Sequence, residues 1–153
     1  MKRCTACGKN GLSSKPLTYA IELGKRTFES EIKGSLCPTC GERFFDGRSI
    51  EKFERQVAKW LIEQGYESSE ELRFLRKVAG IRAADLATLL GVSAETVSHW
   101  ETGKHAVDVA TRNTVALLVS DALRGSDTAQ DRLRALRAPA RIKRVRLGAG
   151  RAA

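Results

Sequence analysis

The sequence predicts an α+β protein that is mostly α, with a small β-hairpin domain at the N-terminus and a five-helix domain after it. All four cysteines lie in the first 40 residues, two runs of alternating apolar and polar residues lie between them, and apolar residues recur at helical spacing further on. A chain of 153 residues can hold two small domains. We therefore expect domains at residues 1–45 and 69–137, a linker at 46–68 and a tail at 138–153.

Two copies of one motif bracket the first domain: CTACG at residues 4–8 and CPTCG at residues 37–41, with 29 residues between the cysteine pairs. Two tight thiolate pairs suit tetrahedral Zn²⁺, and the glycine after each pair frees backbone N–H groups to approach the sulfurs. Four protein ligands leave no position for water, so we predict a structural Zn²⁺ held by Cys4, Cys7, Cys37 and Cys40.

Two other chemistries use cysteines in this way. A thioredoxin-like dithiol needs a βαβ context, and none follows either pair. Iron in a rubredoxin-like site has the same four ligands, so the spacing leaves zinc and iron both open.

Residues 17–23 and 27–32 alternate with period two around Gly24-Lys25, which predicts a β-hairpin between the cysteine pairs. Two strands alone are marginally stable in water. Metal binding can supply on the order of 10 kcal/mol of folding free energy to such a domain.

An amphipathic helix is expected in the linker. Its apolar stripe consists of Ile50, Phe53, Val57, Trp60 and Leu61. The sequence leaves open whether this stripe packs on the hairpin, on the helical domain or on another protein. The polar residues 65–69 are the expected hinge, with Ser69 capping the next helix without a full capping box.

The second domain is organised around residues 72–103. Helical spacing predicts one helix that stops at Gly80 and a second over residues 83–90, and Gly91 then allows a turn before Ser93 caps a third helix running to about residue 101. A helix, a short glycine-containing turn and a second helix are the parts of a helix-turn-helix.

The third helix has one apolar side, with Val97 and Trp100, and one side with short or polar side chains that can enter a major groove. Residues 85–87 (DLA), 90–93 (LGVS) and 96–104 (TVSHWETGK) resemble the Xre/Cro-type helix-turn-helix family. Arg82 and Ala83 depart from that family, which often has Ser or Thr and then Gln there. A helical hairpin that only packs is the alternative.

In this interpretation Glu95, Ser98 and His99 meet base edges, with Glu accepting from cytosine N4. Arg76, Lys104 and Arg112, together with helix N-termini, contact phosphates. The full expected DNA-binding set is Arg76, Ala94, Glu95, Thr96, Ser98, His99, Lys104, Arg112, Arg141, Lys143 and Arg144. We expect neither His99 nor His105 to bind a metal.

Two more helices are expected, one capped by Asp108 and running through Ala122, and one over residues 127–136. The apolar positions of the first are Val109, Val115, Leu118, Val119 and Ala122. The formal charge of +9 lies at the ends: residues 69–125 have seven basic and seven acidic residues, whereas 126–153 have eight against two. We expect a disordered tail, and both a phosphate-tracking arm and a solvated terminus remain open.

Taken together, an N-terminal CxxC, a hairpin, a second CxxC, a linker helix and an Xre-type reader resemble the MqsA/YgiT-type antitoxin family over roughly residues 1–123. The resemblance implies a zinc domain that binds and blocks a protein toxin, commonly an RNA-cleaving one, and a C-terminal domain that dimerises and represses its operon. In the family an amide and an Arg can occur at the positions of Glu95 and His99, so a different operator is implied.

The function predicted is sequence-specific repression at a double-stranded DNA operator by a homodimeric antitoxin, and the alternative is a stand-alone zinc-containing regulator that senses metal or redox state. An enzyme is disfavoured because no catalytic constellation is found. With no apolar span and no leader, we expect a cytoplasmic protein without a membrane partner.

Overall fold

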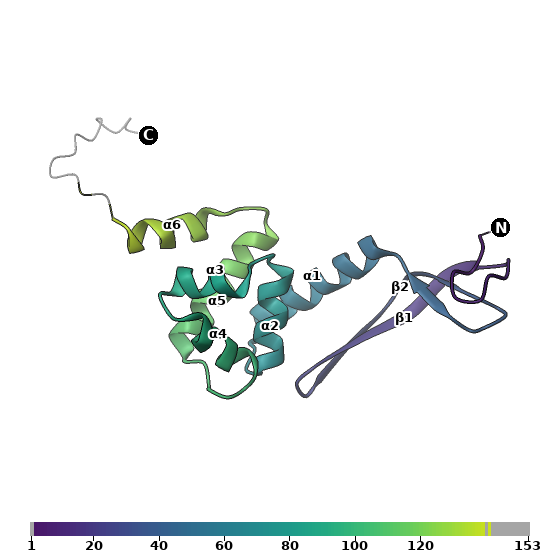
Figure 1. Cartoon of the computed structure of the whole chain (residues 1–153), viewed down its shortest axis with the longest axis horizontal. Helices are drawn as coiled ribbons and strands as arrows, with labels where there is room; N and C mark the ends of the chain where they lie inside the picture. The colour runs from purple at the N-terminus through teal and green to yellow at the C-terminus, as the bar shows by residue number, and fades with distance from the viewer. Residues whose placement is uncertain (1, 140, 142–153) are drawn as a thin grey trace.

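The computed structural model describes residues 2–139 and 141. A three-stranded sheet lies at one end of an elongated molecule and the helices lie toward the other (Figure 1). The strands and helices, in chain order, are β1 Ser13–Leu23, β2 Arg26–Leu36, β3 Arg43–Phe45, α1 Gly47–Gln64, α2 Ser69–Val78, α3 Ala83–Leu90, α4 Ala94–Glu101, α5 Val109–Leu123 and α6 Thr128–Arg137. The fold is α+β and mostly α, as predicted.

The sheet is antiparallel with strand order β1-β2-β3. Leu23 pairs with Arg26, so Gly24-Lys25 forms the predicted two-residue turn, and Gly24 has the positive φ (60°) that this turn requires. The strands extend further than the alternation predicted, since Ser13 still pairs with Leu36. Strand β3 was not predicted, because its three residues are too few to show a period of their own.

Helix α1 connects the two halves of the molecule (Figure 1) and packs on β2, α2 and α5. Phe53, Val57 and Leu61 from the predicted stripe are buried, together with Ala58. Trp60 is the exception: it is 43% exposed and lies edge-on to Phe28 of the hairpin, with 5.3 Å between ring centroids. The stripe thus packs on both the hairpin and the helical domain, a choice that periodicity alone left open.

The start of α2 differs from the prediction. Ser68, not Ser69, is the N-cap, and it forms a complete capping box with Glu71. The Ser68 hydroxyl accepts from the Glu71 N–H, and the Glu71 carboxylate accepts from the N–H of Ser68 and of Glu67. The Ser-x-x-Glu pattern begins at Ser68, one residue before the N-cap predicted from the sequence. Its two side chains accept hydrogen bonds from N–H groups that have no partner within the helix.

Residues 65–69, expected to be a hinge, are held on both sides. Tyr66 is 6% exposed, its hydroxyl donates to the backbone oxygen of Arg112 (3.0 Å), and burial raises the pKa of this hydroxyl above its ordinary value. Arg26, at the hairpin tip, donates to the backbone oxygen of Gly65 and to the Glu71 carboxylate, both at 2.9 Å. The hairpin tip is therefore attached to the start of the helical domain.

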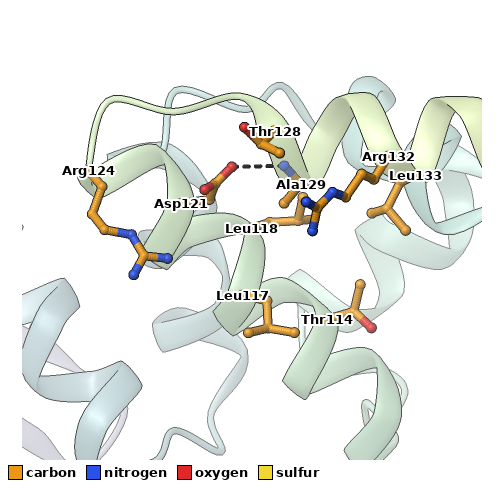
Figure 2. Close-up of a pocket in the computed structure, with 9 residues that line it drawn as sticks. All are labelled: Thr114, Leu117, Leu118, Asp121, Arg124, Thr128, Ala129, Arg132 and Leu133. Carbon is orange, nitrogen blue, oxygen red and sulfur yellow. Dashed lines mark hydrogen bonds between the residues drawn. The ribbon is translucent and has the colours of Figure 1, made fainter. Parts of the chain in front are cut away.

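The helical core contains Leu72, Leu75, Leu86, Val97, Trp100, Val115, Leu118 and Val119. Val109, predicted as a core position of α5, is 61% exposed because it is the first residue of that helix. A groove of about 330 Å³ lies between α5 and α6, and at one side of it the Asp121 carboxylate accepts from the Ala129 N–H at 2.8 Å (Figure 2). Within the described residues, no helix combines the length and the apolar character needed to cross a membrane.

Candidate metal centre and nucleic-acid interface

The two cysteine motifs fold into the same backbone turn. In each, the first cysteine's oxygen accepts from the N–H of the glycine that follows the motif, at 2.9 Å for both Gly8 to Cys4 and Gly41 to Cys37. Both glycines have positive φ, 73° and 72°. The residue after each glycine then donates its N–H to the second cysteine's sulfur. As predicted, the glycine after each cysteine pair lets a backbone N–H group approach a cysteine sulfur.

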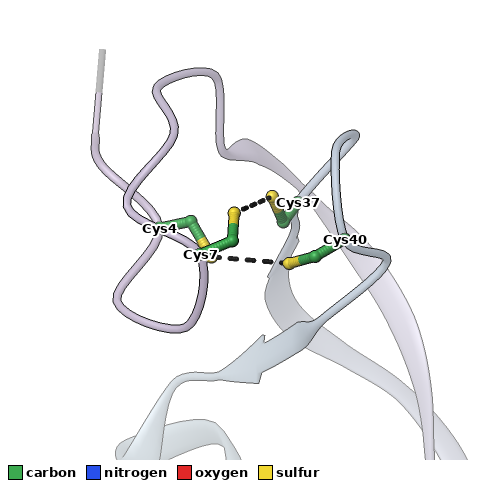
Figure 3. A group of neighbouring side chains, drawn as sticks. All are labelled: Cys4, Cys7, Cys37 and Cys40. Atoms are coloured by element: carbon green, nitrogen blue, oxygen red, sulfur yellow. Dashed lines mark hydrogen bonds between the residues drawn. The ribbon is translucent and has the colours of Figure 1, made fainter.

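The four sulfurs converge on one point (Figure 3). The Sγ–Sγ distances are 3.7 Å for Cys4–Cys40 and 3.7 Å for Cys7–Cys37, and all four sulfurs lie within 4.8 Å of one another. A tetrahedral ion with metal–sulfur bonds of ~2.3 Å places its ligands ~3.8 Å apart, so these thiols fit such an ion. The cluster can therefore hold a metal ion.

Backbone dipoles prepare one of these thiols for the ligand role. The N–H of Cys40, helped by that of Thr39, donates to the Cys37 sulfur and lowers the pKa of this thiol to about 6 even though burial opposes the shift. The thiolate is the form that binds a metal. The effect is confined to Cys37: burial and the neighbouring thiols raise the pKa of Cys7 and of Cys40, although the N–H groups of Lys9 and Glu42 oppose this.

The second candidate site is formed by α3, the turn at Gly91 and α4. Gly91 ends α3 in the left-handed conformation (φ 72°), and the Ser93 hydroxyl accepts from the Thr96 N–H at 3.1 Å as the N-cap of α4. Val97 is fully buried and Trp100 is 8% exposed. Because these two anchor one side of α4, the opposite side faces solvent.

The predicted reading residues lie on this outer side. Ala94, Glu95 and Ser98 are exposed, and Thr96 and His99 are partly exposed. His99 is at the centre of a polar group: its Nε2 atom lies 3.6 Å from a Glu95 oxygen and 3.2 Å from Lys104 Nζ. The His105 ring lies 4.9 Å from the His99 ring, a neighbour that their spacing along the chain did not reveal.

Arg76 does not fit the predicted phosphate contact. Its side chain is 11% exposed, its Nη1 donates to the Ile81 oxygen at 2.7 Å, and its Nε and Nη2 donate to the two carboxylate oxygens of Glu101. The guanidinium is thus used to join the end of α2 to the end of α4. The two residues are 25 positions apart, and no sequence motif connects Arg76 to Glu101 over that distance.

Arg112 is partly buried and is also bonded within the protein. Its Nη1 donates to the Tyr66 oxygen at 3.2 Å, and its Nε is buried without a hydrogen-bond partner among the described residues. Both features argue against the predicted phosphate contact. Lys104 and Arg141 are exposed, consistent with their predicted role, and Lys143 and Arg144 lie outside the described residues, as does most of the expected tail.

Comparison with known proteins gives one match. The model of a protein family described as "Antitoxin component of bacterial toxin-antitoxin system, MqsA" matches residues 1–121. These residues include the cysteine cluster, α1 and the α3–turn–α4 unit, and they end within α5. A search of curated proteins gives no match.

Proposed function

The chain belongs to the MqsA family, the antitoxin component of bacterial toxin–antitoxin systems, and from this premise we propose that it represses transcription by binding an operator through α4 and neutralises a partner toxin through its N-terminal domain. The observation that carries the DNA-binding half is the two-sided character of α4. Its apolar side is buried at Val97 and Trp100, and its outer side presents small or polar side chains. A helix with such an outer side fits the major groove.

Base reading is assigned to Glu95, Ser98 and His99. The Glu95 side chain is 79% exposed, and as an acceptor it suits cytosine N4. His99 is held between Glu95 and Lys104, so its ring has a defined position from which to meet a base edge. Ala94 and Thr96 lie beside them on the first turn of α4 and would approach the backbone or a thymine methyl group.

The metal is proposed to be Zn²⁺ with a structural role. Four thiolates from two rigid turns are the donor set that zinc prefers in closed sites, and no fifth ligand or water position is needed. Bound zinc would connect the N-terminal turn to the far ends of β1 and β2, since Cys37 directly follows β2. The cysteines therefore stabilise the sheet that we propose as the toxin-binding domain.

A homodimer is proposed through the helical domain. Leu117 on α5 and Leu136 on α6 are 67% and 76% exposed, and large apolar side chains at such exposure favour association. Leu117 lines the groove between α5 and α6 (Figure 2), and Leu136 lines the hollow that α6 forms with the end of α3 and the start of α5. A dimer would place two copies of α4 on one side of the duplex, about 34 Å apart.

Co-expression of the full chain with the reading frame next to it in the genome tests the antitoxin half of the proposal. We expect a stable complex that protects growth from the neighbouring protein. If no complex forms, and chelation or thiol oxidation changes DNA affinity while the fold is kept, the stand-alone metal or redox regulator becomes the better assignment.

Selection of duplexes from a random pool by the purified protein tests the DNA half. We expect enrichment of a two-part site with half-sites one helical turn apart, as two copies of α4 require. Enrichment of no sequence would contradict operator binding even if the toxin complex forms.

A further inference from the structure

Helix α6 lies outside the residues that the family model matches. The family match ends at residue 121, and α6 covers Thr128–Arg137. None of its residues is buried, and the partly buried Ala129 and Leu133 pack it against the helical core. The rest of the helix, including its arginines, is left at the surface.

Helix α6 packs against α3 as well as α5. The pKa of Asp85, in the first turn of α3, is lowered by its hydrogen bonds from Arg82 and further by the charge of Arg134 on α6. At the other end of α3, the Arg137 guanidinium rests on Gly91: a Cβ atom added to that glycine would lie 1.8 Å from Arg137 Nη1. Helix α6 therefore spans α3 and brings its last arginine to the turn that leads into α4.

The Arg137 side chain is available for a ligand at this place. The residue is exposed, and no carboxylate of the described residues lies within ion-pair distance of its guanidinium. It lines a hollow with Leu90, the last residue of α3, and Val92 of the α3–α4 turn. An unpaired guanidinium beside the N-terminus of α4 has the position and the charge to bind a phosphate of the DNA backbone.

The helix-turn-helix domain itself has no excess of positive charge. Residues 69–125 carry no net charge, and the guanidinium groups of Arg76 and Arg112 are bonded within the protein. Most non-specific affinity of a protein for DNA comes from basic side chains that neutralise phosphates. A basic residue outside this balanced stretch can therefore add to the contacts expected of Lys104, which is exposed.

We propose that Arg137 is a DNA phosphate-binding residue and that α6 holds it in place beside the α3–α4 turn. This assignment rests on the DNA-binding function proposed above and adds to it a contact outside the family-matched residues. Arg137 also lies near the C-terminal carbonyls of α3, where a cation stabilises a helix. That purely structural role would affect unfolding but not the salt dependence of DNA binding.

The test compares R137Q with R132Q in the full chain. Both variants remove one positive charge from α6, but Arg132 lines the groove against α5 whereas Arg137 lines the hollow beside the α3–α4 turn. The probes are a duplex selected from a random pool by the unaltered protein and a scrambled duplex of the same composition. Binding is measured from 0.05 to 0.4 M salt, with thermal unfolding and sedimentation as checks on fold and assembly.

Loss of one phosphate contact should reduce the magnitude of the slope of log K against log salt by about 0.9. If that contact contributes nothing at 1 M salt, binding at 0.1 M salt should weaken about eightfold, and equally on both duplexes. We expect this for R137Q and less than a twofold change for R132Q.

An unchanged slope for R137Q, or an equal loss in both variants, would overturn the assignment. The same holds if R137Q lowers thermal stability alone. A parent protein that binds neither duplex would overturn operator binding itself, and this assignment with it, so the two failures are distinguishable.

Discussion

The ion pair between Arg76 and Glu101 makes the most direct test of how the helical domain is held together. Both side chains are nearly buried, with 11% and 10% exposed, and the bond is bidentate. Arg76 also donates to the Ile81 oxygen, so one guanidinium joins the end of α2, the start of the α2–α3 connection and the end of α4. Removing the guanidinium leaves the Glu101 carboxylate and the Ile81 oxygen without their hydrogen-bond donor.

The perturbation is R76M, which keeps an unbranched apolar stem and removes the guanidinium and its charge. Breaking a buried pair by removing one partner costs about 3–5 kcal/mol, because the remaining charge stays desolvated. The double variant R76M/E101L should recover most of that loss, since apolar side chains of similar volume replace such a pair without a large penalty. The matched control is R82M: the Arg82 side chain is 82% exposed, and losing its solvent-screened pair with Asp85 should cost far less than losing the Arg76 pair.

Urea unfolding at 10 °C, followed by far-UV circular dichroism, measures these free energies. A loss below about 1 kcal/mol for R76M, equal to that of R82M, would show that the Arg76–Glu101 pair is solvated and would refute the reasoning. DNA binding of the folded variant is the second measurement. Its salt slope should equal that of the parent, and a slope smaller by about 0.9 would restore the phosphate role that the sequence first suggested for Arg76.

Three further predictions follow from the two sites and from one helix cap. E95Q or H99N should change discrimination by about 1–3 kcal/mol at one base pair, measured on a panel of single-substitution duplexes, while E63Q on α1 should change none; an equal loss on every duplex would contradict base reading. C37S should remove the bound zinc, detected by elemental analysis, and expose the amides of β1 and β2 to hydrogen exchange, whereas retained zinc would show that three thiols suffice. The pKa of Asp108 is held below its ordinary 3.8 by hydrogen bonds from the Thr111 hydroxyl and N–H. The stability that this carboxylate contributes is therefore present above pH 3.8 and is lost as pH falls through the lower folded-state pKa. D108N lacks this titration, so the difference in unfolding free energy between D108N and the parent, measured with urea from pH 5 to pH 2, should shrink as pH falls.

The elements that sequence predicted best are those whose signal is local. The two-residue turn at Gly24, the boundaries of α3 and the Ser93 cap of α4 all depend on neighbouring residues, and each was found at its predicted place. The cysteine cluster is a long-range feature with a local signal, because each motif is recognisable alone and the chemistry of four thiolates joins the two. The Ser68 cap shows the limit of this reasoning: either of two adjacent serines can begin the helix, and the position of Glu71 decides between them.

The features that sequence did not predict are pairings between distant residues. Arg26 with Glu71, Tyr66 with Arg112, and Arg76 with Glu101 are separated by 45, 46 and 25 positions. No periodicity or motif connects such residues, so the sequence alone could not show that Arg76 and Arg112 bond within the protein. Trp60 is a similar case. Helical spacing places it in the apolar stripe, but it cannot show that Trp60 lies edge-on to the Phe28 ring and stays partly exposed.

These pairings change how the charge of the reader domain should be counted. Residues 69–125 carry equal numbers of basic and acidic residues, yet a side chain that is tied inside the protein cannot also reach a phosphate. Arg76 donates its hydrogen bonds to Glu101 and to the Ile81 oxygen, and Arg112 donates to the Tyr66 oxygen. The positive charge available to DNA is therefore smaller than the composition implies. Because the helix-turn-helix domain is neutral and two of its arginines hold its own helices together, basic residues of neighbouring segments should supply much of the attraction to the duplex. The salt slope of the intact chain should therefore follow the number of basic residues that follow α5 more closely than the number within α2–α5.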